Sequence, residues 1–341
     1  MLRRAVIALL VVCACACGSS SSSSDDGPLT IRLGYFPNLT HAPALVGLKD
    51  GMFAKQLGND VTIETRTFNA GGDAVTAILS GSIDMSFMGP NPTTNAFVQS
   101  HGEAVRVISG ATSGGALLVV RAGITSPDQL RGKKIADPQL GGTQDVALRW
   151  YLKNQGYNVD KLGGGDVSVL PQDNSITLNA FKQRQIDGAW VPEPWASRLV
   201  VEGGGHVLVD ERDLWPDGKF VTTDLVVSTQ FLHAHPKRVK QFLTGLYGTL
   251  QFLTSNPSDS ESIANAAVGE ITGKPLAAGV VAAAWPHMTF TLDPLAATLK
   301  TSADHAHSLG LLGNVDLKGL YDLTLLNEVL SEQGQPPVSG L

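Results

Sequence analysis

Three short polar segments of this sequence hold the residues that could bind an anion. Residues 89–94, 112–113 and 141–144 carry hydroxyl and amide groups but no lysine or arginine. We expect helices to begin at the first and third of these segments, and the first turn of a helix exposes unpaired N–H groups and a partial positive charge. Several such donors converging on one oxyanion would form an electrically neutral cradle for it. For each threonine taken singly, the alternative is a simple helix cap.

Aromatic and acidic side chains near these segments could complete a ligand site. Trp190, Trp195 and Phe36 are candidates for an apolar wall against the tail of a ligand, although Trp190 fits the core of the protein equally well. Glu193 and Asp224 are acidic, and they could hold either a ligand amine or a hinge.

The histidines are weaker candidates for a ligand site or a metal site. His41 stands at the start of an expected helix, where its ring could either point an N–H into a cleft or cap the helix. Two pairs, His233 with His235 and His305 with His307, are two residues apart, and such residues do not share a helix face. The sequence also has no P-loop, nucleophile elbow or dinucleotide fingerprint. We therefore expect no catalytic residue, no metal and no cofactor.

The composition argues against several classes of function. The formal net charge of the 341 residues is −6 and no basic patch stands out, which argues against nucleic-acid binding. All three cysteines lie at positions 13, 15 and 17, so the rest of the chain offers no disulfide, zinc ribbon or thiol nucleophile. The length suggests about two domains.

The N-terminus has the plan of a secretory signal. Arg3 and Arg4 precede an apolar run of about a dozen residues, shorter than the ~20 residues that span a membrane. Small residues then lead to Cys17, and a serine run follows, which resembles a bacterial lipoprotein signal. We expect a signal peptide over residues 1–16 and a lipidated Cys17 with a linker over residues 17–28, so that only the lipid anchor meets the membrane. Cys15 is the alternative site of lipid attachment. The alternative to a lipoprotein is a soluble secreted protein whose signal peptide is cleaved nearby.

Strands and helices are expected to alternate along most of the chain, which is the pattern of α/β layers. Residues 41–53 predict one helix, and the chain after residue 236 is expected to be mainly helical. Two segments, residues 82–92 and 185–195, have matching strand–turn–helix patterns. Ligands of open α/β sheets sit beyond the carboxyl ends of the strands. Two such lobes facing each other would bind a ligand in the cleft between them.

Several short motifs between residue 29 and about residue 231 occur in the same order as in a known protein family. They include Gly34-Tyr35-Phe36-Pro37, His41-Ala42-Pro43-Ala44, Gly81-Ser82-Ile83-Asp84, Gly89-Pro90-Asn91-Pro92, Gly141-Gly142-Thr143 and Ile186-Asp187-Gly188-Ala189-Trp190. The ordered set resembles the periplasmic solute-binding proteins of the nitrate, taurine and aliphatic-sulfonate family of ABC transporters. The superfamily also includes binders of thiamine pyrimidine precursors.

This resemblance implies a two-lobed α/β fold of the type II periplasmic binding proteins. Two mixed sheets flanked by helices would be joined by two crossing strands, which we place at residues 116–120 and 224–228. Lobe 1 would comprise residues 29–116 and 229–341 with the C-terminal helices, and lobe 2 would comprise residues 117–228.

The resemblance also implies a function without catalysis. The protein would be an extracytoplasmic, monomeric substrate-binding protein that captures a small anionic solute and passes it to ABC permease and ATPase subunits. We expect an aliphatic sulfonate, because tryptophan and phenylalanine near the donors suit a tail; taurine, nitrate and a thiamine pyrimidine precursor are alternatives. A surface lipoprotein without a transport role and a pyrimidine-synthesising enzyme of the same fold are alternatives from other classes. The expected ligand-binding residues are Phe36, Asn38, His41, Gly89, Pro90, Asn91, Thr112, Ser113, Gly142, Thr143, Gln144, Trp190, Glu193, Trp195 and Asp224.

Overall fold

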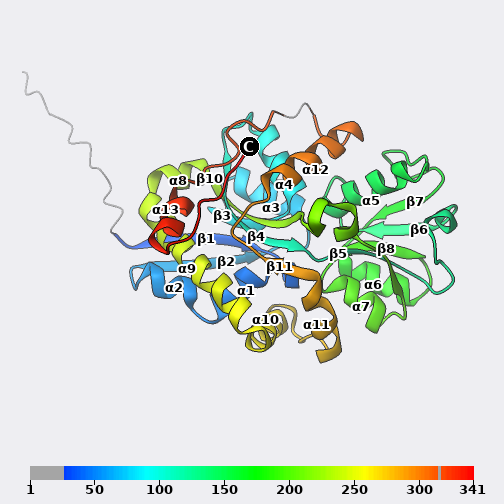
Figure 1. Ribbon diagram of the computed structural model, residues 1–341, viewed down its shortest axis with the longest axis horizontal. Coiled ribbons are helices and arrows are strands. Elements are labelled where there is room, and N and C mark those ends of the chain that lie inside the picture. Colours follow the sequence, from blue (N-terminus) through cyan, green and yellow to red (C-terminus); the bar gives the residue numbers. More distant parts are fainter. Residues whose placement is uncertain (1–26, 314–315) are drawn as a thin grey trace, which may run out of the picture.

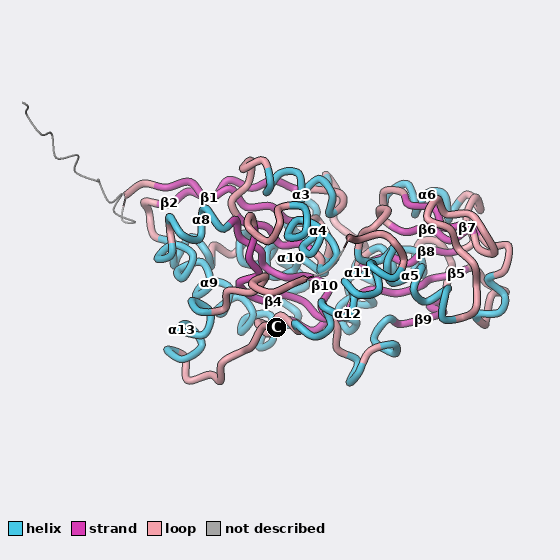
Figure 2. Tube along the Cα trace, turned by 90° about the horizontal axis from the view of Figure 1, so that it is seen from above, coloured by secondary structure: helices cyan, strands magenta, loops and turns pink. Residues whose placement is uncertain are grey.

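Two mixed β-sheets, each flanked by helices, lie side by side in the protein (Figures 1 and 2). The computed structural model describes residues 27–313 and 316–341, and the expected signal peptide and Cys17 lie outside them. The predicted α/β fold with two mixed sheets is confirmed. Among the described residues, no helix is both long enough and apolar enough to cross a membrane.

The first sheet has six strands in the order β11-β4-β10-β3-β1-β2. Strand β1 lies between β2 and β3 and is parallel to both, whereas β10 runs antiparallel to β3 and β4. Strand β11 pairs with β4 at the edge, also antiparallel. The strands are β1 (Leu29–Tyr35), β2 (Val61–Thr67), β3 (Met85–Met88), β4 (Val105–Gly114), β10 (Val221–Ser228) and β11 (Met288–Phe290).

The second sheet has five strands in the order β7-β6-β8-β5-β9. Strand β6 is parallel to β7 and β8, and β5 is antiparallel to β8 and β9. All five residues of β5 are apolar and buried, as expected for a strand with helices on both faces of its sheet. The strands are β5 (Ala116–Val120), β6 (Lys134–Asp137), β7 (Ser168–Pro171), β8 (Gly188–Pro192) and β9 (His206–Asp210).

The helices follow the strands, and the chain becomes mainly helical after β10. Residues 41–53 do not form the single expected helix, because Gly51 adopts a φ of 68° and ends α1 before α2 begins. The helices are α1 (Ala42–Lys49), α2 (Met52–Leu57), α3 (Gly71–Leu79), α4 (Pro90–Gln99), α5 (Thr143–Asn154), α6 (Asn174–Lys182), α7 (Trp195–Val201), α8 (Thr229–Ala234), α9 (Pro236–Ser255), α10 (Pro257–Thr272), α11 (Ala278–Ala284), α12 (Ala296–Ser308) and α13 (Thr324–Glu332).

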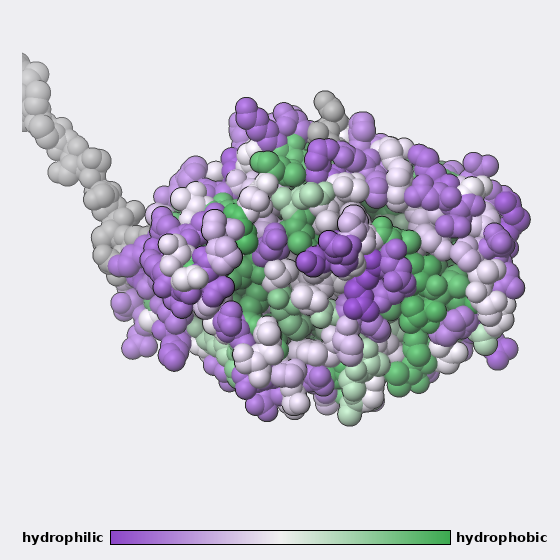
Figure 3. All heavy atoms as spheres, viewed as in Figure 1, coloured by the Kyte–Doolittle hydropathy of each residue, from purple (hydrophilic) through white to green (hydrophobic). Residues whose placement is uncertain are grey.

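Large apolar side chains fill the space between helices and sheets in both lobes. In the first lobe, the fully buried rings of Phe53 and Phe242 stack with their centroids 4.2 Å apart, which fixes α2 against α9. In the second lobe, Trp190 of β8 is fully buried against Tyr151 of α5. The surface is mixed in character, with a hydrophobic area over the second lobe (Figure 3).

The chain crosses between the sheets twice. Gly114 and Gly115 join β4 to β5, and both have positive φ values, 77° and 78°, which glycine adopts without steric cost. The chain returns through residues 211–220, because Val221 already pairs with Ser113 in the first sheet. Both crossings therefore precede the segments expected from the sequence: residues 116–120 lie within the second sheet and residues 224–228 within the first.

Two C-terminal helices contact both lobes. Helix α12 packs on α4 and α5, and α11 packs on α7; both lie at the boundary between the lobes in Figure 2. Side chains add further links, because His287 Nδ1 lies 2.6 Å from Glu193 Oε1 and Lys161 donates to the Gly310 carbonyl at 3.0 Å. The lobes are thus held together by packing and polar contacts as well as by the chain itself.

Candidate functional site

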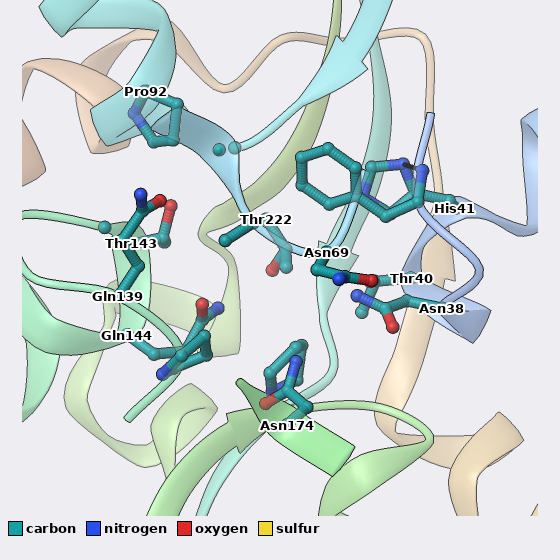
Figure 4. Close-up of a pocket in the computed structure, with 17 residues that line it drawn as sticks. Asn38, Thr40, His41, Asn69, Pro92, Gln139, Thr143, Gln144, Asn174 and Thr222 are labelled. Atoms are coloured by element: carbon teal, nitrogen blue, oxygen red, sulfur yellow. Dashed lines mark hydrogen bonds between the residues drawn. The ribbon is translucent and has the colours of Figure 1, made fainter. Parts of the chain in front are cut away.

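A small cavity of about 40 Å³ lies between the two lobes (Figure 4). It forms where strands of both sheets end, since Phe36 follows β1, Gly89 follows β3 and Pro138 follows β6. This is the place where open α/β sheets bind their ligands. The first lobe contributes Phe36, Asn38, Thr40, His41, Asn69, Ala70, Gly71, Gly89, Pro92 and Thr222, and the second contributes Pro138, Gln139, Gly142, Thr143, Gln144, Asn174 and Pro192.

The lining of this cavity carries no lysine, arginine, aspartate or glutamate. Its polar groups are carboxamides, hydroxyls, backbone amides and one histidine. Among the described residues, no group of three or more acidic, histidine or cysteine side chains could hold a metal ion. A ligand in the cavity would therefore be bound by neutral dipoles.

Helices α3 and α5 begin at the cavity from opposite lobes. Their N-cap residues, Ala70 and Gly142, have no side-chain acceptor that could cap the first backbone amides. In α3 the Gly72 amide is instead bonded by Gln139 Oε1 of the other lobe, so the remaining first-turn amides and the helix dipoles are what attract negative charge. The Thr143 hydroxyl of α5 lies so close to Gly89 that a side chain on that glycine would collide with it. The first turn of α5 is thus in close contact with the other lobe.

Helix α4 contributes less than the sequence suggested. Pro90 and Pro92 occupy its first turn and have no N–H to donate. The Thr93 hydroxyl donates to the Gly89 carbonyl at 2.8 Å, and the Thr94 hydroxyl donates to the Asn91 carbonyl at 3.0 Å. These two hydroxyls bond within their own helix.

Two carboxamides of the lining have their oxygens occupied by bonds to the other lobe. Asn38 Oδ1 accepts from Trp195 Nε1 at 2.9 Å, and Gln139 Oε1 accepts from the Gly72 amide at 2.8 Å. Both bonds connect the two lobes. Because an amide nitrogen only donates, these side chains favour a ligand that accepts hydrogen bonds.

Three further carboxamides complete the polar lining. Figure 4 shows Asn69 on the same side as Asn38, and Gln144 with Asn174 across the cavity from them. The Oδ1 atom of Asn174 is buried and has no partner among the described residues. It could accept a hydrogen bond from an N–H or O–H group of a ligand.

His41 is neutral and lines the cavity. Its burial lowers the pKa of the imidazole to about 3. Its Nδ1 atom accepts from the Phe36 amide at 3.5 Å, and the two rings pack with centroids 4.6 Å apart. With Nδ1 as the acceptor, the proton sits on Nε2, which makes the ring a donor. The side chain does not cap helix α1.

The NMT1-like family matches residues 25–268 of this sequence, more than half of the chain. The chain belongs to the NMT1-like family. Among its relatives, the taurine-binding periplasmic protein of Escherichia coli (strain K12) is 30% identical over 215 residues. That match covers 63% of this chain and 64% of the relative, so it spans just under two thirds of that protein's length.

Solved structures share the fold of this NMT1-like protein. The alkanesulfonate-binding protein SsuA from Xanthomonas axonopodis pv. citri, bound to MOPS, superposes with a TM-score of 0.68 at 21% identity, covering 84% of this chain and 96% of that one. The periplasmic nitrate-binding protein NrtA from Synechocystis PCC 6803 superposes with a TM-score of 0.75 at 14% identity, covering 91% and 90%. These relatives are binding proteins by name rather than enzymes.

Seven of the fifteen residues expected to bind ligand line the cavity of this NMT1-like protein. They are Phe36, Asn38, His41, Gly89, Gly142, Thr143 and Gln144. The sequence analysis missed the carboxamides Asn69, Gln139 and Asn174. Each follows the end of a strand within three residues, namely β2, β6 and β7, and that position is the signal that could have found them.

The two tryptophans lie outside the cavity lining for different reasons. Trp190 is fully buried in the second lobe, where its Nε1 donates to Glu211 Oε2 at 2.8 Å. It is a core residue, as the alternative interpretation had it. Trp195 does not line the cavity, but its Nε1 donates a hydrogen bond to Asn38, which does. The apolar wall of the cavity is formed instead by Phe36, the Pro92 ring and other prolines.

Acidic and hydroxyl candidates also lie outside the lining. The Glu193 carboxylate accepts hydrogen bonds from the Ser197 amide and hydroxyl and contacts His287. It therefore links the two lobes at their boundary and does not line the cavity. Asp224 is fully buried, and neither of its oxygens has a partner among the described residues. Ser113 Oγ accepts from the Phe220 amide.

The other three candidates outside the lining are Thr112, Pro90 and Asn91. Thr112 is buried in β4 without a hydrogen-bond partner among the described residues. The Asn91 side chain turns toward α12, where it bonds Ser302. Pro90 is buried in the first turn of α4.

Proposed function

We propose that this protein is an extracytoplasmic substrate-binding protein of an ABC importer that captures a small sulfonate monoanion in the cavity between its lobes. It would work as a monomer and deliver the sulfonate to permease and ATPase subunits. The observation that carries this proposal is that Asn38 and Gln139, one lining residue from each lobe, both have their oxygens occupied, so that these side chains offer a ligand their N–H₂ groups.

A sulfonate suits these donors. It offers three acceptor oxygens that share one negative charge, and helix N-termini with neutral N–H donors bind such groups. The cavity is small, which favours a compact head group over a ring. Phe36 and the prolines Pro92, Pro138 and Pro192 would contact a short alkyl tail. The names of the relatives, a taurine-binding and an alkanesulfonate-binding protein, agree with this class.

An alkyl sulfonate fits better than taurine for a specific reason. The ammonium group of taurine would find no carboxylate in the lining, and the nearby Glu193 is already engaged by Ser197 and His287. Burying an ammonium group without an ionic partner is costly. Nitrate has no tail, so it would leave the apolar wall unused.

We expect the purified full-length protein to bind ethanesulfonate at least about ten-fold more tightly than taurine or nitrate, which corresponds to ~1.4 kcal/mol. Calorimetric titration with the three anions at equal ionic strength measures this ranking. Tighter binding of taurine would contradict the absence of an ammonium partner. A lack of binding by all three anions would refute the proposed function.

The membrane attachment is a separate proposal, which rests on the small residues before Cys17 and the serine run after it. A cysteine that carries two acyl chains is firmly anchored, whereas an unmodified chain is not. We expect Cys17→Ser to move the protein from the membrane fraction to the soluble fraction. If Cys17→Ser remains at the membrane and Cys15→Ser does not, Cys15 is the lipid site.

A further inference from the structure

A second and larger cavity, of about 430 Å³, lies on the boundary between the lobes and away from the first. Its walls are α5 of the second lobe, the turns at Glu211–Leu214 and Pro216–Gly218, and α12 of the first lobe. Helices α5 and α12 lie next to each other at this boundary (Figure 1). No residue is shared between the linings of the two cavities.

Aromatic rings form much of this wall. Trp150, Tyr151 and Trp215 line the cavity together with His305. The His305 ring stacks on Trp150 with the centroids 4.0 Å apart, and burial lowers the pKa of this histidine, which keeps it neutral. Lys153 Nζ lies 5.4 Å from the Trp150 ring but is not part of the lining. The lining has no lysine or arginine.

Glu211 is the single formally charged group of this lining, and its side chain has no cationic partner. The residue is 2% exposed. Its oxygens accept from Trp190 Nε1 at 2.8 Å and from Trp215 Nε1 at 3.4 Å, and it forms no ion pair with any residue that the structure describes. Burial raises the pKa of this carboxyl to about 7. A carboxylate buried with only neutral donors is costly, and a cation beside it would offset that cost.

We propose that this cavity binds a small organic cation of the quaternary-ammonium class. Its charged head would lie beside the Glu211 carboxylate, and its methyl groups would contact the rings of Trp150, Trp215 and Tyr151. One face of Trp150 is covered by His305 and one face of Trp215 by Phe220, so the cation would contact the remaining ring surfaces together with the carboxylate, a combination that attracts organic cations. The cavity is large enough to admit a ligand of this size. This second site goes beyond the proposed anion binding in the cleft and does not depend on it.

Calorimetric titration of the purified full-length protein tests the proposal at pH 8, where Glu211 is mostly ionised. The probes are choline chloride and its uncharged carbon analogue, 3,3-dimethyl-1-butanol, with sodium chloride in the reference buffer. We expect choline to bind saturably and the uncharged analogue to bind at least about ten-fold more weakly. Equal binding of both probes, or no saturable binding of choline, would overturn the proposal.

Two variants locate the site. Glu211→Gln keeps the size of the side chain and should weaken choline binding about ten-fold or more. Because this buried change could also disturb the fold, a second variant, Ala297→Phe, fills the cavity from an exposed position on α12. It should abolish choline binding, whereas Ala282→Phe, at an exposed position on α11 outside the cavity, should not. Unchanged choline binding by Ala297→Phe would place the cation elsewhere and refute the site.

One further variant separates this proposal from the proposed function. Thr143→Ala alters the cleft and should leave choline binding unchanged, because Thr143 does not line the second cavity. A loss of choline binding in this variant would mean that choline occupies the cleft, which contradicts a second site.

Discussion

Replacing Thr143 by alanine should weaken the binding of ethanesulfonate at least about ten-fold. The Thr143 hydroxyl lines the cleft cavity at the first turn of α5, against Gly89 of the other lobe. A hydrogen bond to a charged group contributes ~1.5–3 kcal/mol, and ~1.4 kcal/mol corresponds to a factor of ten in affinity. Calorimetric titration of the variant and the wild type gives the ratio of the two dissociation constants directly.

The controls separate a neutral cradle from ordinary charge attraction. Thr254→Ala removes a hydroxyl from an exposed position on α9, and Lys133→Ala removes a positive charge; neither residue lines the cleft, so neither change should alter affinity appreciably. Moderate salt should matter little, because an enclosed site is weakly screened. Binding should also be similar at pH 5 and pH 8, since His41 remains neutral with a pKa of about 3. Wild-type affinity in Thr143→Ala together with a large loss in Lys133→Ala would refute the neutral cradle.

The sequence predicts the parts of this protein that depend on local pattern. Residues 141–144 begin a helix as expected, and Gly142, Thr143 and Gln144 all reach the cavity. The strand-ending positions of Phe36 and Gly89 follow from the alternation of strands and helices, which places successive strand ends at one edge of a sheet. The α/β layering follows from the same alternation, whereas the two mixed sheets were an implication of the family resemblance.

Side-chain direction depends on tertiary packing and was less predictable. Asn91 lies just where a helix was expected to begin, yet its side chain faces Ser302 of α12, a residue more than two hundred positions away. The Asn38 oxygen is occupied by Trp195 of the other lobe, a residue more than one hundred and fifty positions away. Both crossings were placed late, because a pair of glycines makes the first one and an irregular segment makes the return, rather than β-rich runs. Long-range contacts of this kind leave no periodicity in a single sequence.

Replacing Asp224 by asparagine should raise the thermal stability of the protein, and the gain should grow with pH. Asp224 is fully buried in β10, and both of its oxygens are without a partner among the described residues. Burial is the main cause that raises the pKa of this carboxyl well above its ordinary value, and the charge of Asp293 raises it further. An unpaired polar group buried in this way costs ~1–3 kcal/mol when it cannot bond, and more when it is charged.

The direction of the pH dependence follows from the raised pKa. In the unfolded chain the carboxyl ionises near pH 4, whereas in the folded protein it retains its proton to a higher pH. The wild type therefore has its full stability below about pH 4 and loses it as the pH rises toward the folded pKa, by at most ~1.4 kcal/mol per pH unit from this group. Asparagine does not ionise, so the variant lacks this loss.

Melting curves of the two proteins at pH 4 and pH 8 measure the effect. We expect nearly equal melting temperatures at pH 4 and a variant that melts roughly 2–5 °C higher at pH 8, taking ~1–3 kcal/mol for the ionisation that asparagine avoids and about 1.5 °C per kcal/mol for a chain of this size. Asp60→Asn, at an exposed position just before β2, is the matched control and should change the melting temperature little at either pH. If Asp224→Asn melts lower than the wild type at pH 8, the carboxylate is ionised and paired in the folded protein. Its burial would then stabilise the first sheet instead of straining it.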